Sequence, residues 1–184
     1  SRPASGAEHL ISHIWEMEHL SKDGLDVSHG FKVAIGTLTV AYLYEQLKSL
    51  DIGSCYGNPI QSWEEREDAI RAFFVDEQVC EQTLVIARSK FLPTDQLLER
   101  RRALSHLLPV LTAQIEEQIP PYEQLKAAMK DVSAPTTVQQ INTNLEGLRR
   151  AVTGAQMIRN RYTILDLYYE LGLLDWALAS LEGM

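Results

Sequence analysis

Apolar residues recur along this chain at the spacing of helices. Leu10, Ile14 and Met17 follow one another at intervals of four and three residues, which predicts a helix over about 6–20 with one buried face. A second helix is expected from His29 to about Leu50, and its interior over 33–43 is apolar nearly all round, so we expect it to be the buried central helix. Its β-branched residues are also typical of strands, but strands rarely exceed ten residues, and length therefore favours a helix.

The same periodicity continues to the last residues. Further helices are expected at about 62–75, 77–87, from 95 onward, and at 122–132, 144–159, 164–171 and 175–181. No βα alternation and no internal repeat interrupts this series. The 184 residues are enough for one core, so the pattern predicts an all-α multi-helix bundle that forms a single domain over 1–184.

Local signals within the helices add detail. A Ser or Thr side chain can cap a helix, and Ser62 (with Glu65), Thr94 and Thr163 stand at expected N-termini. Pro109 is expected to kink or end the helix that carries it. Gly36 is expected to allow two helices to pack closely. The run Arg100-Arg101-Arg102 fans around a helix, which favours a solvated face over a phosphate site.

Composition narrows the class of protein. The net charge of −8 argues against a surface for nucleic acid or for anionic lipid. We expect no membrane insertion, because no apolar run approaches the length of a spanning helix and no signal peptide opens the chain. Cys55 and Cys80 are two thiols without a framework spacing, which indicates a reduced, cytoplasmic protein.

Four of the five histidines lie in the first 36 residues, and three of them, His9, His13 and His29, are spaced so that two helices could bring them together. His9 and His13 are four residues apart and therefore lie on one face of the first helix, whose start at Gly6 is predicted by a capping box of Ser5 and Glu8. Ser28 is an N-cap candidate that places His29 at the first position of the second helix. The turn signal Asp23-Gly24 lies between them, so two antiparallel helices can bring His29 near His9.

Imidazoles that converge in this way are typical ligands of zinc and related divalent metals. A catalytic metal needs about three protein ligands and one open position. His9 and His29 are two candidates, and His13 is either a third ligand or a proton donor. No acidic residue is an obvious further ligand, because Glu8 is assigned to the helix cap and Glu16 lies a turn beyond His13. A pair of surface histidines is the simpler alternative.

These residues also carry a resemblance. Residues 2–13 (RPASGAEHLISH), residues 28–37 (SHGFKVAIGT) and the segment 158–175 resemble parts of the helical domain of sn-glycerol-1-phosphate dehydrogenases. Ala134-Pro135-Thr136-Thr137 is similar to a turn between helices of the same family. That family is part of a larger group with glycerol dehydrogenases, iron-type alcohol dehydrogenases and dehydroquinate synthases. The resemblance spans the chain from its first residues to its last.

The resemblance implies a role for each of these residues. His9 and His29 would be two ligands of a catalytic divalent metal, with zinc expected and nickel or iron as alternatives, and the third ligand would be an Asp on a preceding segment. His13 would contact the substrate or transfer a proton. Arg2 would help to hold the substrate. Phe31 departs from the pattern, because many relatives have Glu after the His-Gly pair.

An enzyme of this kind needs a nicotinamide cofactor, NAD(H) or NADP(H), yet no Gly-rich phosphate loop is present in these 184 residues. We therefore expect the N-terminal nucleotide-binding domain to be absent from this chain, and the fragment alone to be inactive. The substrate would be the phosphorylated small molecule dihydroxyacetone phosphate. The face left by the missing domain would be apolar, so we expect a homo-oligomer.

Two alternatives stay open. One is the corresponding domain of a glycerol or polyol dehydrogenase or of a dehydroquinate synthase. The other, from a different class, is a non-catalytic helical interaction domain whose leucine-rich faces bind a partner.

Overall fold

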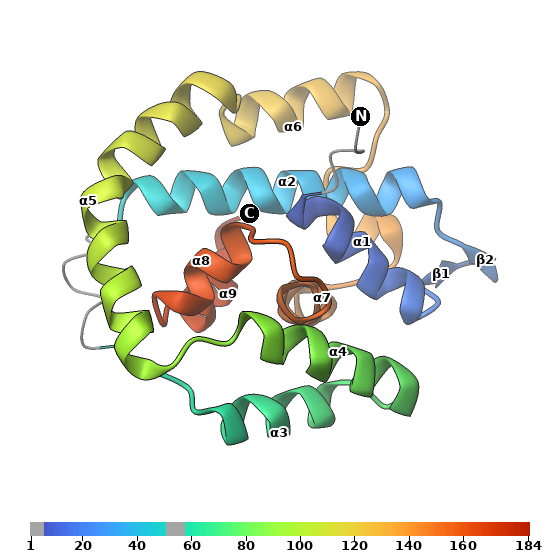
Figure 1. Ribbon diagram of the computed structural model, residues 1–184. Coiled ribbons are helices and arrows are strands. Elements are labelled where there is room, and N and C mark those ends of the chain that lie inside the picture. The colour runs from blue at the N-terminus through green and yellow to red at the C-terminus, as the bar shows by residue number, and fades with distance from the viewer. Residues whose placement is uncertain (1–5, 51–57) are drawn as a thin grey trace, which may run out of the picture.

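A computed structural model describes residues 6–50 and 58–184, and it is an all-α bundle, as the sequence predicts (Figure 1). A two-stranded antiparallel hairpin is the one sheet in this described part. The α-helices are α1 (Ala7–Met17), α2 (His29–Lys48), α3 (Trp63–Phe73), α4 (Glu77–Lys90), α5 (Thr94–Gln118), α6 (Tyr122–Asp131), α7 (Leu145–Met157), α8 (Ile164–Glu170) and α9 (Leu174–Ser180). The short elements are β1 (Ser21–Lys22), β2 (Leu25–Asp26) and the 3-10 turns η2 (Val138–Ile141) and η3 (Leu181–Gly183). The predictions for Arg2, Ser5 and Cys55 lie outside the described residues.

Helix α2 is the central element, as its apolar sequence predicts. It runs through the middle of the bundle, with α6 on one side and α7, α8 and α9 on the other (Figure 1). Helix α1 packs against it most extensively. Gly36 explains how closely the two approach: a Cβ at this position would lie 2.5 Å from the backbone oxygen of Glu8. The close packing predicted for Gly36 is therefore confirmed, because any side chain there would push α1 away.

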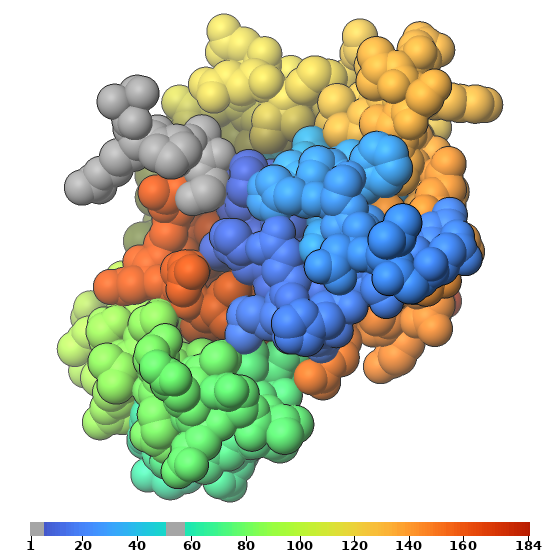
Figure 2. All heavy atoms as spheres, turned by 90° about the vertical axis from the view of Figure 1, so that its right-hand side faces the viewer, coloured from blue at the N-terminus to red at the C-terminus, as the bar shows by residue number. Residues whose placement is uncertain are grey.

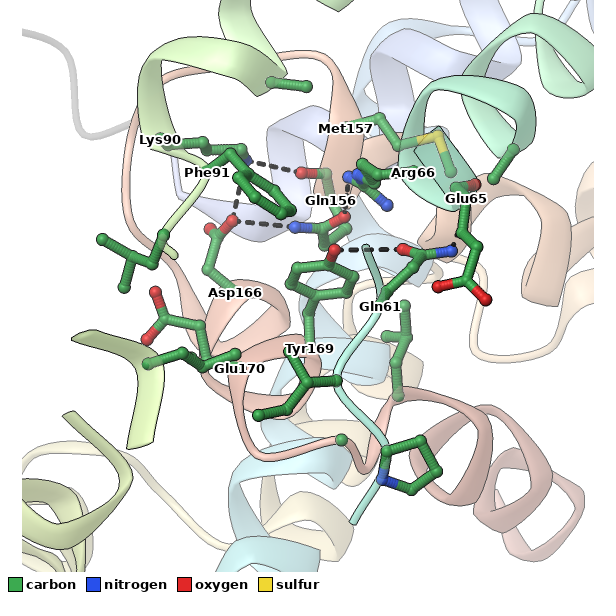
Figure 3. A pocket seen from close by; sticks show the side chains of 18 of the residues that line it. Gln61, Glu65, Arg66, Lys90, Phe91, Gln156, Met157, Asp166, Tyr169 and Glu170 are labelled. Atoms are coloured by element: carbon green, nitrogen blue, oxygen red, sulfur yellow. Dashed lines mark hydrogen bonds and ion pairs between the residues drawn. The ribbon is translucent and has the colours of Figure 1, made fainter. Parts of the chain in front are cut away.

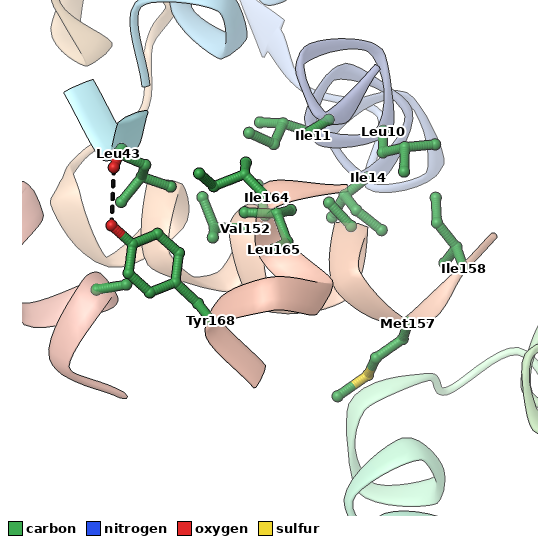
Figure 4. Close-up of a cluster of buried hydrophobic side chains, with 14 of the residues drawn as sticks. Leu10, Ile11, Ile14, Leu43, Val152, Met157, Ile158, Ile164, Leu165 and Tyr168 are labelled. Atoms are coloured by element: carbon green, nitrogen blue, oxygen red, sulfur yellow. Dashed lines mark hydrogen bonds between the residues drawn. The ribbon is translucent and has the colours of Figure 1, made fainter. Parts of the chain in front are cut away.

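The core joins the two ends of the chain. Leu10, Ile11 and Ile14 of α1 meet side chains of α7 and α8 in a continuous buried cluster (Figure 4). The phenol of Tyr168 in α8 is also buried and donates a hydrogen bond of 2.7 Å to the backbone oxygen of Leu43 in α2. Contacts with α7 and α8 thus hold α1 and α2 in place relative to each other. Met17, expected on the inner face, is 41% exposed, and that prediction is wrong.

Most predicted helix starts are confirmed. The side chain of Ser28 accepts a hydrogen bond from the Phe31 amide at the start of α2. Capping boxes begin α3 and α8, at Ser62 and Thr163 respectively. Thr94 is the exception. The N-cap of α5 is Pro93, and Thr94 is the first helical residue, so no side chain caps this helix by a hydrogen bond.

Helix α5 does not end at Pro109. It continues to Gln118, and its axis bends around the end of the bundle (Figure 1). Pro109 has no N–H to donate to the backbone oxygen of Ser105 four residues earlier, and on its other side the hydroxyl of Thr112 donates to the backbone oxygens of Leu108 and Pro109. Since Pro109 is exposed and the helix is bent, α5 continues past it, and of the two predicted outcomes only the kink agrees with the structure.

The solvated face predicted for the three adjacent arginines is wrong for Arg101, which is 1% exposed. Its guanidinium donates to the backbone oxygens of Glu170, Asn58 and Pro59 at 2.7, 2.8 and 3.2 Å. This side chain therefore ties α5 to the end of α8 and to the segment before α3. Across the described residues, none of the helices is long and apolar enough to cross a membrane.

Candidate metal centre

The hairpin between α1 and α2 turns the chain back on itself. Ser21 pairs with Asp26, and Lys22 with Leu25, around a two-residue turn. Both turn residues, Asp23 and Gly24, have positive φ angles of 54° and 78°. An Asp-Gly turn of this kind suits the twist of a tight hairpin. It sends α2 back alongside α1, which is the antiparallel arrangement that the sequence predicts.

As a result, the three histidines lie together. The ring centroids of His9 and His29 are 5.5 Å apart, and those of His13 and His29 are 6.4 Å apart. The predicted approach of His29 to His9 is therefore confirmed. Their side chains are between 32% and 51% exposed. With these exposures the group is open to solvent, and α1 and the start of α2, which carry it, lie in blue near the centre of the face drawn in Figure 2.

Glu16 is the residue of this site that the sequence argument missed. One carboxylate oxygen lies 2.8 Å from Nδ1 of His13, and the other lies 2.6 Å from Nδ1 of His29. Partial burial acts to raise its pKa, but the hydrogen bonds with His29 and His13 hold the pKa of Glu16 below its ordinary value. Its spacing of three residues from His13 was a usable signal, because such pairs share a helix face.

Glu8 has a related role on the other side of the group. Its Oε1 accepts from the Gly6 amide at 2.9 Å and lies 3.0 Å from Nδ1 of His9. The carboxylate thus caps the helix, as expected, although the amide it reaches is that of Gly6. It also orients the His9 ring. Gly6 is the N-cap of α1, one residue before the first helical residue.

The carboxylates determine what the imidazoles can do. An ionised carboxylate only accepts hydrogen bonds, so each Nδ1 that faces one carries the proton, and Nε2 of the neutral ring keeps its lone pair. Metal-binding histidines in proteins are typically oriented in this way by a carboxylate on the other ring nitrogen. The donor set of His9 and His29, with Glu8 and Glu16 behind them, therefore fits a divalent metal such as zinc.

The fit is incomplete within the described residues. Over 6–50 and 58–184, no group of three His, Cys, Asp or Glu side chains is arranged to hold a metal ion. The pair His9 and His29 thus needs at least one more ligand from elsewhere to complete a catalytic site.

Comparison with known proteins identifies relatives over the whole length of the chain. A glycerol-1-phosphate dehydrogenase (NAD(P)+) of Bacillus licheniformis is 24% identical over all 184 residues, which cover 33% of that protein. Proteins of the same name from Geobacillus thermodenitrificans and Methanococcus maripaludis are each 25% identical, over 95% and 90% of this chain. The resemblance found in the sequence is thereby confirmed: the chain is a homologue of glycerol-1-phosphate dehydrogenases.

The chain spans about one third of the length of these relatives. Where a match extends over 90–100% of this chain, it covers 26–35% of the relative. No family model matches the chain. No solved structure matches it either. The names of the relatives support an oxidoreductase at the level of the family.

Proposed function

We propose that this chain is the metal- and substrate-binding helical part of an NAD(P)-dependent oxidoreductase similar to sn-glycerol-1-phosphate dehydrogenase, which reduces dihydroxyacetone phosphate. The observation that carries the proposal is the approach of His29 to His9, at 5.5 Å between ring centroids, with a carboxylate behind each ring. Homology to proteins named for this activity supports the same assignment.

His9 and His29 would hold the metal through their Nε2 atoms. A divalent metal at this position supplies a Lewis acid for the substrate carbonyl. His13 lies beside these two rings and is not needed as a metal ligand. Its Nδ1 donates a hydrogen bond of 2.8 Å to Glu16. Its Nε2 is then suited to exchange a proton with the substrate oxygen.

The anionic end of the substrate would meet positive potential. Helix α2 is 20 residues long and begins at His29, so its amides and the positive end of its dipole lie beside the histidines. Arg2, outside the described residues, would donate hydrogen bonds to the phosphate. Glu8 and Glu16 are the nearby negative charges, and the hydrogen bonds that they accept from the histidine Nδ1 atoms stabilise these carboxylates.

The rest of the enzyme would be supplied by segments outside these 184 residues. We propose that they hold NAD(H) or NADP(H) and the third metal ligand, an Asp. On this proposal the chain alone has no dehydrogenase activity. The assembly would be a cytoplasmic homo-oligomer, with the described helices packed against the nucleotide-binding domain.

Metal binding by the complete gene product tests the site. We expect His29→Ala and His9→Ala each to reduce zinc affinity, measured by competition with a chromophoric chelator, and to abolish reduction of dihydroxyacetone phosphate. Glu16→Gln should weaken zinc binding by about 10- to 100-fold, since it orients a ligand without being one. His106→Ala is the matched control, because His106 is an exposed histidine on α5.

His13→Ala separates the two roles assigned to the histidines. It should leave zinc content unchanged and lower kcat. Assays with glycerol, with dihydroxyacetone phosphate and with a dehydroquinate synthase substrate identify the reaction. Unchanged zinc content and activity in His29→Ala would remove the basis of the proposal.

A further inference from the structure

A second polar site lies away from the histidines. A cavity of about 640 Å³, open on one side, is lined by residues of α3, α4, α5, α7 and α8 together with the segments beside them. Figure 3 shows the charged and amide side chains that point into it from these elements. Its remaining wall is apolar and includes Ala69, Ala87, Leu97, Met157 and Leu174. No described histidine lines it, so it is distinct from the candidate metal centre.

The two buried carboxylates of the cavity are already engaged. Oδ1 of Asp166 accepts from Nζ of Lys90 at 2.7 Å and from Nε2 of Gln156 at 3.1 Å (Figure 3). Its Oδ2 accepts from the Thr163 amide. Glu170 accepts from Arg100 at 2.8 Å and from the Tyr162 hydroxyl at 2.8 Å. Both of these buried carboxylates are thus paired with donors other than Arg66.

Arg66 is a cation of the cavity wall that takes no part in these ion pairs. Its side chain belongs to a residue that is only 4% exposed, it donates to the neutral amide oxygen of Gln156, and it stacks on the ring of Tyr169 at 4.5 Å from the centroid. Among the residues that the structure describes, no carboxylate lies within 4.0 Å of it. Burial lowers the pKa of the Arg66 guanidinium, as expected for a charge removed from water.

A buried charge without a carboxylate in direct contact is costly, and for Arg66 the attraction of Tyr169 and Asp166 offsets the desolvation only in part. A guanidinium has five N–H donors in a planar fork, and one hydrogen bond to Gln156 leaves most of this capacity unused. The fork matches the two oxygens of a carboxylate or a phosphate. Arg66 lines the cavity, so such a group can reach it from inside.

We propose that this cavity binds a small organic anion, whose carboxylate or phosphate pairs with Arg66 and whose body lies against the apolar wall. The volume is within the range of pockets that enclose small ligands. Tyr169 backs the guanidinium and keeps its plane fixed, and Gln156 holds one edge, so the remaining donors are oriented before the anion arrives. This binding is independent of the proposed dehydrogenase function.

Titration calorimetry of the 184-residue chain in buffer of low chloride tests the proposal, with benzoate and inorganic phosphate as the two probes. We expect one of them to bind with a dissociation constant of about 1 mM or lower. The probe that binds identifies the head group. Arg66→Met, which keeps the volume and removes the charge, should weaken this binding by about tenfold or more. Arg71→Gln is the control, because Arg71 is an exposed arginine on the same helix.

A second variant keeps the test decisive if Arg66→Met does not fold. Ala69 lines the cavity one helical turn after Arg66, so Ala69→Glu places a carboxylate beside the guanidinium from within the chain. This variant should melt at a higher temperature than the parent without anion and should no longer bind the probe. The proposal is overturned if neither probe binds at about 10 mM, which is roughly ten times the expected dissociation constant. It is also overturned if Arg66→Met binds the probe as the parent does, or if Ala69→Glu still binds it.

Discussion

Gly36→Ala is a direct test of how α1 is held against α2. The added methyl would lie 2.5 Å from the backbone oxygen of Glu8 and 3.2 Å from its carbonyl carbon and Cα. These are backbone atoms, so no side chain can rotate away, and α1 itself must move by several tenths of an ångström. Overpacking of this kind costs about 1–3 kcal/mol. Alanine offsets about 1 kcal/mol of that cost through its better helix propensity.

Gly30→Ala separates these two effects. Gly30 lies on the same helix, and a Cβ there would have nothing within 4 Å. It should therefore stabilise the protein by about 0.4–1 kcal/mol through backbone entropy alone. Gly36→Ala should be less stable than Gly30→Ala by about 1–3 kcal/mol, which is the packing cost. Equilibrium unfolding in urea measures both.

The same displacement should reach the histidines. Glu8 carries the oxygen that the methyl meets, and its carboxylate orients His9, so moving α1 shifts His9 relative to His29. We expect zinc affinity to fall in Gly36→Ala and to stay unchanged in Gly30→Ala. Equal stability of the two variants would refute the reasoning that Gly36 sets the distance between the helices.

Two further predictions concern the buried polar groups. Arg101→Met should destabilise the protein by about 3 kcal/mol in urea unfolding, because it leaves three backbone oxygens without their donor; a loss below about 1 kcal/mol would contradict this account. Burial raises the pKa of Glu170, so the folded state binds its proton more tightly than the unfolded state, and stability from this group is lost as pH rises above 4.5. Relative to Glu170→Gln, the parent should therefore gain stability as pH falls from about 7 to 5, and a difference independent of pH would count against it.

Local chemistry made the helices predictable. Caps such as Ser28 and Thr163 act within three residues of themselves, and the periodicity of apolar residues acts within one helix, so both can be recognised in the sequence. The errors arose where a distant segment decides the environment. Arg101 is part of a charged run, but its partners are the backbone oxygens of Glu170, Asn58 and Pro59, which the sequence places far away.

The candidate metal centre divides in the same way. His9, His13 and His29 were accessible from spacing, caps and a turn signal, and the structure brings them together. Glu16 was set aside as too far along the helix, yet it faces both His13 and His29, because α2 returns on the side of α1 that Glu16 occupies. Which side that would be is a property of how α1 packs and cannot be read from the hairpin alone.

The sequence by itself determined that this chain is helical, where most helices begin, and which histidines could meet, since these depend on hydrogen bonds and contacts between near neighbours. The tertiary structure decided which charges are buried and which of them are paired. Arg66 is the clearest case: on α3 it is an ordinary arginine, and only the packing of α3, α7 and α8 places it in a cavity wall whose carboxylates bind other donors. Desolvation depends on every segment that surrounds a group, so no local pattern could have indicated it.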